Sequence, residues 1–316
     1  MSVYFQLLQD LNFFILSFLI VSLILIVIVV IISYLAMKRL VVPNEHTRSG
    51  GHRAGLLKEI KPKILARPDL REVEFKNDEG QILKGFFFKR PNPKGNLLLC
   101  HGIHSIKEFF YLFLEMFPDY NILMFDFRAH GQSEGDLITI GFKESNDVIN
   151  ASIFLKNKTK NDGELPLIIF GASMGGAASL KATEINPNIC DALIIDSSFK
   201  SLREIVYESF HVRSKGLPRF PFFYVTKWVF YFVSKINFDK MLPIESVKKI
   251  NKPIFFIHSS NDNIVPSKNS VEMFAVTTHE KSRLWVGPEC QHARLHNVYL
   301  DLYRKKVNKF LKNIFN

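Results

Sequence analysis

The sequence predicts an α/β fold, in which a mostly parallel sheet carries helices on both faces. Short apolar runs of strand length alternate along the chain with longer stretches of helical periodicity, which is the pattern of such folds. One of these apolar runs leads directly into a glycine-rich turn and a helix, over 165–185. A long uncharged run near the N-terminus predicts one membrane-spanning helix ahead of the sheet. At 47% hydrophobic and 22% charged, the composition is that of a globular chain.

The uncharged run covers 13–36, which is 24 residues without a charged side chain. As a helix it would extend about 36 Å, more than the roughly 30 Å of a bilayer core. A cleaved secretory signal is the alternative, but such signals have a basic start and an apolar core of only about 7–15 residues. Residues 1–12 contain no Lys or Arg. We therefore predict an uncleaved anchor helix over 13–37 after a short tail over 1–12.

The charges that follow the anchor indicate its orientation. From Lys38 to Arg71 there are nine Lys or Arg and three Asp or Glu, a net charge of +6. Basic flanks tend to stay cytoplasmic and can lie against anionic lipids. The sequence thus predicts a single-pass protein whose large domain is cytoplasmic, with the bilayer as a partner. The formal net charge of +11 is not accompanied by a nucleic-acid-binding motif, so no nucleic acid is expected.

A basic linker is expected over 38–69, followed by one domain over 70–316. The sheet of this domain is expected to have eight strands, the first two forming an antiparallel pair. The strands are predicted at 70–75, 81–88, 96–100, 121–127, 165–170, 192–195, 254–258 and 282–286. Helices are predicted at 107–117, 142–156, 173–185, 267–279 and 298–314.

An insertion over 200–249 separates two of the buried strands and is expected to form a helical cap. Eight of the fourteen residues from Phe220 to Val233 are aromatic. The aromatic run is short and contains Lys227, so it is not expected to cross a bilayer. It is either a binding surface for an apolar group or ordinary packing of cap helices.

The three cysteines, Cys100, Cys190 and Cys290, have no paired spacing, so neither a disulfide framework nor a metal pattern is predicted. Cys100 and Cys190 adjoin apolar runs and are expected to be buried thiols. We predict no metal and no cofactor.

A Gly-x-Ser-x-Gly motif places Ser173 between a strand and a helix. The motif alone is weak, but a sharp strand-to-helix turn needs small neighbours and exposes the serine hydroxyl. Ala172, Gly175 and Gly176 supply small neighbours. The Met174 N–H then lies at a helix N-terminus, where it can donate to an oxyanion. We predict that Ser173 is a nucleophile.

A serine hydroxyl needs a base, and the base needs a carboxylate. His292, in the loop before the last helix, is favoured as the base over His296, which begins that helix. Asp262, after the strand at 254–258, is favoured as the carboxylate over Asp196.

A second oxyanion donor is expected from the loop after the third strand. Gly102 allows the backbone to turn close to the substrate, and Ile103 would supply the N–H. His101 and His104 are expected to be structural. No carboxylate cluster accompanies them, so they do not predict a metal site.

With these motifs, the segment 126–133 and the segment 261–266, the chain resembles the α/β-hydrolase superfamily over about 70–315. It is most similar to membrane-anchored serine hydrolases of the ABHD type, which include acylglycerol hydrolases and protein depalmitoylases. The resemblance implies a Ser173–Asp262–His292 triad with Ile103 and Met174 as oxyanion donors. Ala129 departs from the family, in which a glycine is common at this position of the loop.

The expected reaction is hydrolysis of a carboxylic ester or thioester through an acyl-enzyme on Ser173. The aromatic insertion would bind an apolar acyl chain, with Phe222, Phe223 and Trp228 in contact with the substrate. A small-molecule or lipid ester is therefore the expected substrate. The alternatives are a peptidase or amidase on the same fold, and a non-catalytic binding module tethered to the membrane. The sequence predicts no oligomeric state.

Overall fold

The computed structural model describes residues 2–214 and 216–315. It divides into two compact units. The helical unit comprises Met1–Leu40 and Tyr207–Phe238, and the sheet unit comprises Val41–Val206 and Asp239–Asn316.

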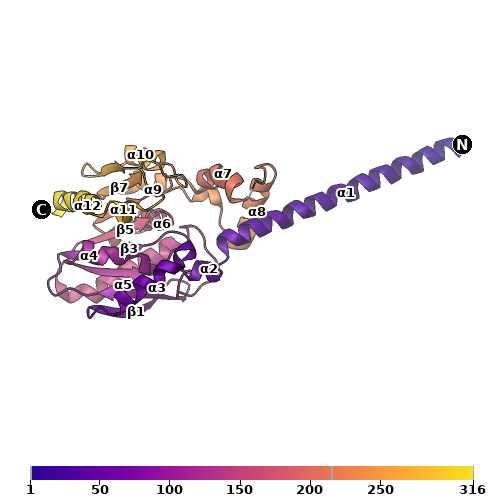
Figure 1. Ribbon diagram of the computed structural model, residues 1–316. Coiled ribbons are helices and arrows are strands. Elements are labelled where there is room, and N and C mark those ends of the chain that lie inside the picture. The colour runs from indigo at the N-terminus through magenta and orange to yellow at the C-terminus, as the bar shows by residue number, and fades with distance from the viewer. Residues whose placement is uncertain (1, 215, 316) are drawn as a thin grey trace. The chain divides into compact units, whose positions relative to one another are not determined.

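The sheet unit contains an eight-stranded sheet with the order β1-β2-β4-β3-β5-β6-β7-β8. Four of its strands, β1, β3, β5 and β7, are labelled in Figure 1. β2 pairs antiparallel with β1 and β4, and the other neighbours pair parallel. The predicted mostly parallel sheet is thus confirmed. Its strands are β1 Leu70–Lys76, β2 Ile82–Phe88, β3 Gly95–Cys100, β4 Tyr120–Phe125, β5 Leu167–Ala172, β6 Ala192–Asp196, β7 Ile254–Ser259 and β8 Arg283–Gly287.

Helices cover the sheet, and the side chains of each strand alternate between its two faces. On one face, Leu97, Phe170 and Ile257 share a buried cluster with side chains of α4 and α12, among them Phe113 and Phe310. α5 contacts β3, and α6 contacts both β3 and β5. The main helices of this unit are α4 Tyr111–Met116, α5 Glu144–Thr159, α6 Met174–Ile185, α9 Pro243–Lys249, α10 Lys268–Ala275, α11 Leu295–Val298 and α12 Leu300–Phe315. The helix α7, Leu202–Arg213, begins in the sheet unit and ends in the helical unit.

The segment expected to be a linker, 38–69, is largely helical and packs within the sheet unit from Val41 onward. Its elements are α2 Glu45–Arg48, η1 Gly51–Arg53 and α3 Ala54–Leu65. Ile60 and Ile64 are fully buried and lie one helical turn apart on α3. Packing of such an apolar stripe stabilises the folded state. The basic composition of the segment concealed this stripe.

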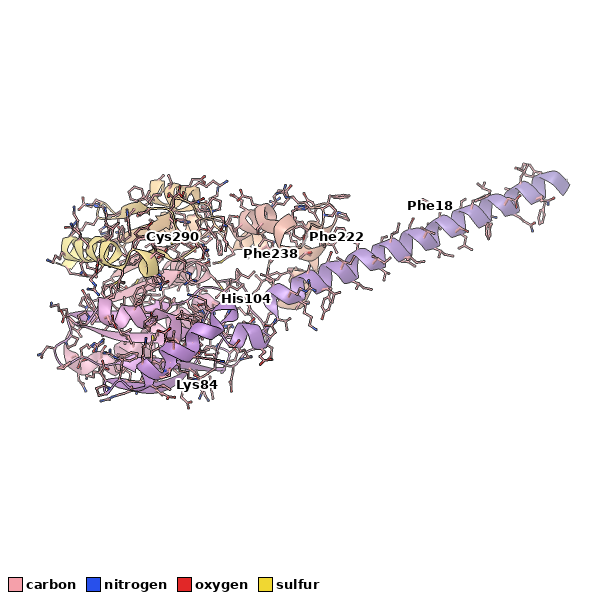
Figure 2. The ribbon with its side chains drawn as sticks, in the orientation of Figure 1. Phe18, Lys84, His104, Phe222, Phe238 and Cys290 are labelled. Carbon is pink, nitrogen blue, oxygen red and sulfur yellow. The ribbon has the colours of Figure 1, made fainter. Side chains whose placement is uncertain are left out.

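The helical unit contains α1, Ser2–Val41, and α8, Phe222–Ser234. α1 starts at Ser2, so residues 1–12, expected to be a tail, are helical from Ser2 onward. The reason is that Ser2–Val41 contains no glycine or proline to interrupt it. From Tyr4 to Val41 the helix is long and apolar enough to cross a membrane. Phe18 projects from it and is largely exposed (Figure 2).

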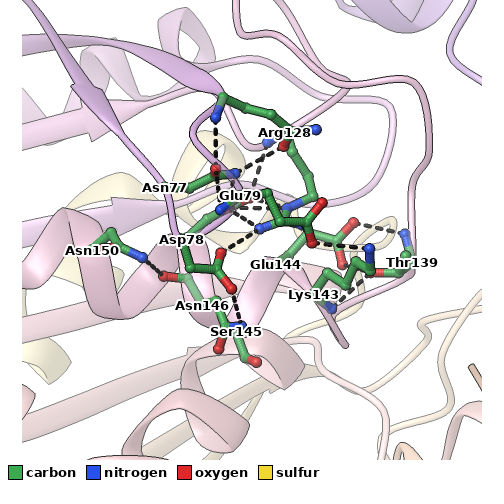
Figure 3. Close-up of polar contacts among 12 residues, drawn as sticks. Asn77, Asp78, Glu79, Arg128, Thr139, Lys143, Glu144, Ser145, Asn146 and Asn150 are labelled. Carbon is green, nitrogen blue, oxygen red and sulfur yellow. Dashed lines mark hydrogen bonds and ion pairs between the residues drawn. The ribbon is translucent and has the colours of Figure 1, made fainter.

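Two buried ion pairs fix the loop that follows β4. Arg128 donates to both carboxylate oxygens of Asp147 on α5, at 2.7–3.1 Å, and both side chains are almost fully buried. Its other donors reach Asp78 and Glu79 in the turn between β1 and β2 (Figure 3). Lys107 forms the second pair, with Asp126, at 2.6 Å.

The same loop contains the departure from the family pattern. Ala129 has a φ of 61°, in the left-handed region that glycine adopts at lower cost. Gly131 is also left-handed, and a Cβ atom there would lie 2.2 Å from Cγ of Asp126. The loop therefore tolerates alanine at 129 at some cost in strain, whereas position 131 requires glycine.

We predict that Arg128→Met lowers the free energy of unfolding by about 3–5 kcal/mol, because Asp147 would stay buried without its cationic partner. Urea unfolding of the full chain in detergent, followed by near-UV circular dichroism, measures this change. The control is Lys63→Met, which removes the exposed Lys63–Glu59 pair and should leave stability nearly unchanged. Equal small effects of both substitutions would contradict the prediction.

Candidate active site

Ser173 occupies the turn between β5 and α6 in a conformation that is rare for a residue with a side chain. Its φ is 53° and its ψ is −117°. The N–H of Ser173 donates to the carbonyl oxygen of Asp196 at 2.8 Å, and the hydroxyl of Ser198 donates to the Ser173 carbonyl oxygen at 3.0 Å. These two bonds from the end of β6 hold the strained backbone in place.

Glycines make this turn possible because the chain passes very close to its neighbours. A Cβ atom on Gly175 would lie 2.2 Å from the carbonyl oxygen of Cys100, at the end of β3. A Cβ atom on Gly171 would lie 2.6 Å from the Gly175 carbonyl oxygen. On Gly176 it would lie 2.9 Å from Cβ of Ser198. The small residues of the motif are thus required by close packing on both sides of Ser173.

The structure brings Ser173, His292 and Asp262 together at the carboxyl ends of the parallel strands. Nε2 of His292 lies 2.9 Å from Oγ of Ser173, and Nδ1 of His292 lies 2.7 Å from Oδ2 of Asp262. Ser173 follows β5, Asp262 follows β7 and His292 follows β8. An ionised carboxylate only accepts hydrogen bonds, so Nδ1 carries the proton and Nε2 can accept the serine proton.

Asp262 is buried and firmly held. Its Oδ1 accepts hydrogen bonds from the N–H groups of Ile264 and Val265, each at 2.9 Å. Burial by itself would raise the pKa of the Asp262 carboxyl, but interactions with His258 and His292 outweigh it and hold the pKa well below its usual range. The carboxyl therefore stays ionised and can stabilise a protonated His292.

His258, at the end of β7, is a supporting residue that the sequence reasoning missed. It is fully buried, and its Nε2 donates to the carbonyl oxygen of Val265 at 2.7 Å and lies 3.4 Å from Oδ2 of Asp262. Its Nδ1 accepts from the hydroxyl of Ser270 at 2.7 Å. A histidine at a strand end four residues before the aspartate was the available signal.

The two alternative residues, Asp196 and His296, are not part of the hydrogen-bond chain from Ser173 through His292 to Asp262. The Asp196 carboxylate accepts from the hydroxyls of Ser197 and Tyr303, both at 2.9 Å. Nδ1 of His296 is 3.9 Å from this carboxylate. The hydroxyl of Ser197 also accepts from the N–H of Ala293 at 3.3 Å, so Ser197 supports the loop that carries His292.

The loop expected to donate to the oxyanion lies directly beside Ser173. A Cβ atom on Gly102 would lie 3.3 Å from Cβ of Ser173. His101 donates through Nδ1 to the Gly102 carbonyl oxygen at 2.8 Å and accepts at Nε2 from the N–H of Phe127. Burial lowers the pKa of His101 to about 4, so it stays neutral as a structural residue. Ile103, the expected donor, follows Gly102 in this loop.

A second buried histidine holds the far side of the loop. Nε2 of His130 accepts from the N–H of His104 at 3.2 Å, while its Nδ1 donates to the Arg128 carbonyl oxygen at 2.9 Å. These hydrogen bonds of His130 therefore connect the loop after β4, which contains Arg128, to the loop after β3, which contains His104.

Met174, the other expected donor, is the first residue of α6, so its N–H has no acceptor one turn earlier in the helix.

The three expected substrate contacts, Phe222, Phe223 and Trp228, belong to the helical unit. The Phe223 ring is buried against Tyr207 and Phe210, whereas the Trp228 side chain is 63% exposed. Phe222 begins α8 (Figure 2). Their contact with substrate remains a prediction.

Cysteine thiols and metal-binding clusters are the other groups that could take part in chemistry. Cys100 and Cys190 are buried free thiols, as predicted, and burial raises the pKa of Cys190 to about 11. Over the described ranges, no three His, Cys, Asp or Glu side chains gather as a metal site. A wide surface depression that includes Tyr120 and Pro166 lies at the opposite, amino-terminal ends of the strands.

Known proteins resemble this chain in both sequence and fold. The family model described as serine aminopeptidase, S33, matches residues 91–224. The uncharacterized protein YqkD of Bacillus subtilis is 28% identical over 242 residues, which cover 74% of this chain and 77% of that protein. The lysophosphatidylserine lipase ABHD12 of Danio rerio is 27% identical over 170 residues, which cover 52% of this chain and 41% of the lipase.

Among solved structures, the Pyrococcus furiosus esterase Pf2001 superposes with a TM-score of 0.64 at 23% sequence identity. The match covers 81% of this chain and 96% of the esterase. The chain has the α/β-hydrolase fold and is similar in sequence to members of that superfamily.

We predict that Ser173→Gly is more stable than Ser173→Ala by about 1 kcal/mol. Both remove the hydroxyl, but only glycine relieves the strain of about 1–3 kcal/mol, which its greater freedom in the unfolded chain partly offsets. Thermal unfolding of the two full-length variants in the same detergent measures the difference. An alanine variant as stable as the glycine variant would show that the turn is not strained.

Proposed function

We propose that this protein is a membrane-anchored serine hydrolase that cleaves carboxylic ester or thioester bonds. The observation that carries the proposal is the continuous chain of short hydrogen bonds from Ser173 through His292 to Asp262. In this arrangement the hydroxyl has a base at its oxygen, and the base has a buried, ionised partner.

In the first step Oγ of Ser173 attacks the carbonyl carbon while Nε2 of His292 takes the hydroxyl proton. The carbonyl oxygen becomes an oxyanion, to which the N–H groups of Ile103 and Met174 would donate. The bond to the leaving group then breaks, and His292 returns the proton to the departing alcohol or thiol. The acyl group remains as an ester on Ser173.

In the second step a water molecule attacks the acyl carbon as His292 accepts one of its protons. The acid is released when the bond to Oγ breaks and Ser173 regains a proton from His292. Asp262 keeps the imidazole in one tautomer and stabilises its cationic form in both steps.

A substrate that partitions into membrane fits this chain best. α1 is apolar over the length needed to cross a bilayer, and the lipase ABHD12 among the relatives is named for a lysophospholipid. We propose an acyl ester of a membrane lipid or an acylated protein as substrate. Lys38 and Arg39 at the end of α1 favour a cytoplasmic position for the sheet unit.

A peptidase or amidase is the second candidate, because the matching family model is described as serine aminopeptidase. The same triad can attack an amide, although the leaving amine must then receive its proton from His292 before it departs. Substrate profiling distinguishes the two candidates.

We expect Ser173→Ala to lose labelling by a fluorophosphonate probe and to lower kcat for a nitrophenyl ester by at least about 10³-fold. Asp262→Asn should lower kcat by about 10⁴-fold, because the amide favours the wrong tautomer of His292. The matched control is His296→Gln, which should keep labelling and activity per folded molecule. Wild-type protein that failed to label would support a non-catalytic binding module instead.

Activity should rise with acyl chain length across a series of nitrophenyl esters, because each buried methylene contributes about 0.8 kcal/mol to binding. Initial rates in mixed micelles, from acetate to laurate, measure this dependence. A matched series of nitroanilides tests the amidase candidate. An optimum at acetate with no hydrolysis of longer esters would contradict a lipid substrate.

A further inference from the structure

The helix α8 has an exposed face made of aromatic side chains. Tyr224, Trp228, Tyr231 and Phe232 are all 45–63% exposed and follow one another at helical spacing. The opposite stripe, which includes Phe223 and Phe230, is buried. An aromatic stripe therefore runs along the outer side of α8 for its whole length.

This arrangement does not suit contact with water. A surface helix of a soluble protein carries polar residues on its outer face, whereas a helix that is apolar all round is covered by protein or lipid. Within Phe222–Ser234, Lys227 is the one charged residue. The exposed aromatic face thus needs a cover.

A hydrogen bond connects the start of α8 to the apolar helix α1, near the C-terminal end of the uncharged run of α1. The hydroxyl of Ser33 donates to the carbonyl oxygen of Phe222, the first residue of α8, at 3.4 Å. Ser33 lies five residues before Lys38, which is about 7.5 Å along the helix axis. If α1 spans a bilayer, its uncharged run ends here, so α8 begins where hydrocarbon gives way to lipid headgroups.

The composition around α8 suits that level of a membrane. Tyrosine and tryptophan are enriched where hydrocarbon meets headgroups. Between residues 209 and 238 the chain has five Lys or Arg and no Asp or Glu. Lys235 lies 5.9 Å from the centre of the Phe232 ring, so positive charge accompanies the aromatic stripe. Such charges are attracted to anionic lipids.

We propose that the aromatic stripe of α8 lies in the headgroup region of the leaflet reached by the C-terminal end of α1. The protein would then hold the bilayer at two places, a spanning helix and an interfacial helix. This inference rests on the proposed membrane anchor. It assigns Trp228 to contact with lipid rather than with the acyl chain of a bound substrate.

The sequence offers a direct test, because Trp228 and Trp285 are its two tryptophans. The full-length Trp285→Phe variant would be placed in vesicles of phosphatidylcholine and phosphatidylglycerol. We expect blue-shifted emission from Trp228 and at least about twofold quenching by lipids brominated near the headgroup end of the acyl chain. The matched Trp228→Phe variant reports Trp285, which lies on β8, and should show little lipid quenching.

Two results would overturn the proposal. Water-like emission that acrylamide quenches and brominated lipid does not would show an exposed stripe. Blue-shifted emission without bromine quenching would show a protein cover, such as a second copy of the chain. If Trp285→Phe fails to fold, the difference between wild-type and Trp228→Phe spectra gives the same readout.

Extraction of the vesicles with alkaline carbonate separates this inference from the anchor on which it rests. A chain that is extracted has no spanning helix, so the anchor itself would be wrong. A chain that stays in the membrane with Trp228 exposed to water keeps the anchor and refutes only the interfacial helix.

Discussion

The strained turn at Ser173 is the constraint on which the rest of the site depends. A residue with a side chain holds a positive φ there because β3, β6 and α6 approach so closely that only glycine fits around it. The strain lifts the hydroxyl above the carboxyl edge of the sheet and points the first N–H of α6 at the same place. Hydrogen bonds from the end of β6 keep the turn from relaxing.

Buried polar groups extend this constraint to the loops that carry Asp262 and His292. Asp196 connects the turn at Ser173 to Ser197 and Tyr303. Ser197 in turn holds the backbone beside His292. His258 holds the loop of Asp262 from the end of β7. Because Asp196, Ser197, Tyr303 and His258 each have a specific hydrogen-bond partner, the three loops have little freedom to drift apart. The proposed acyl transfer needs such preorganisation, which the contacts at this sheet edge would supply.

Local patterns allowed much of this to be predicted from sequence. Periodicity predicts the eight strands. Motif position predicts the sharp turn at Ser173 and the order of Asp262 and His292. Contacts between distant residues were not predictable: Tyr303 reaches Asp196 across 107 positions, and no local pattern shows it. The helical segment before β1 was missed because basic residues surround Ile60 and Ile64. Residues 1–12 were expected to be a tail because only their charge and polarity were considered, not their lack of helix breakers.

The most direct test of the account is to observe the acyl group on the protein. Full-length enzyme mixed with a long-chain nitrophenyl ester and quenched in acid within milliseconds would be digested and analysed by mass spectrometry. The account predicts a transient acyl mass on the peptide that contains Ser173, decaying as free acid accumulates. Turnover without any acyl mass on that peptide, or with the acyl group on another residue, would contradict it.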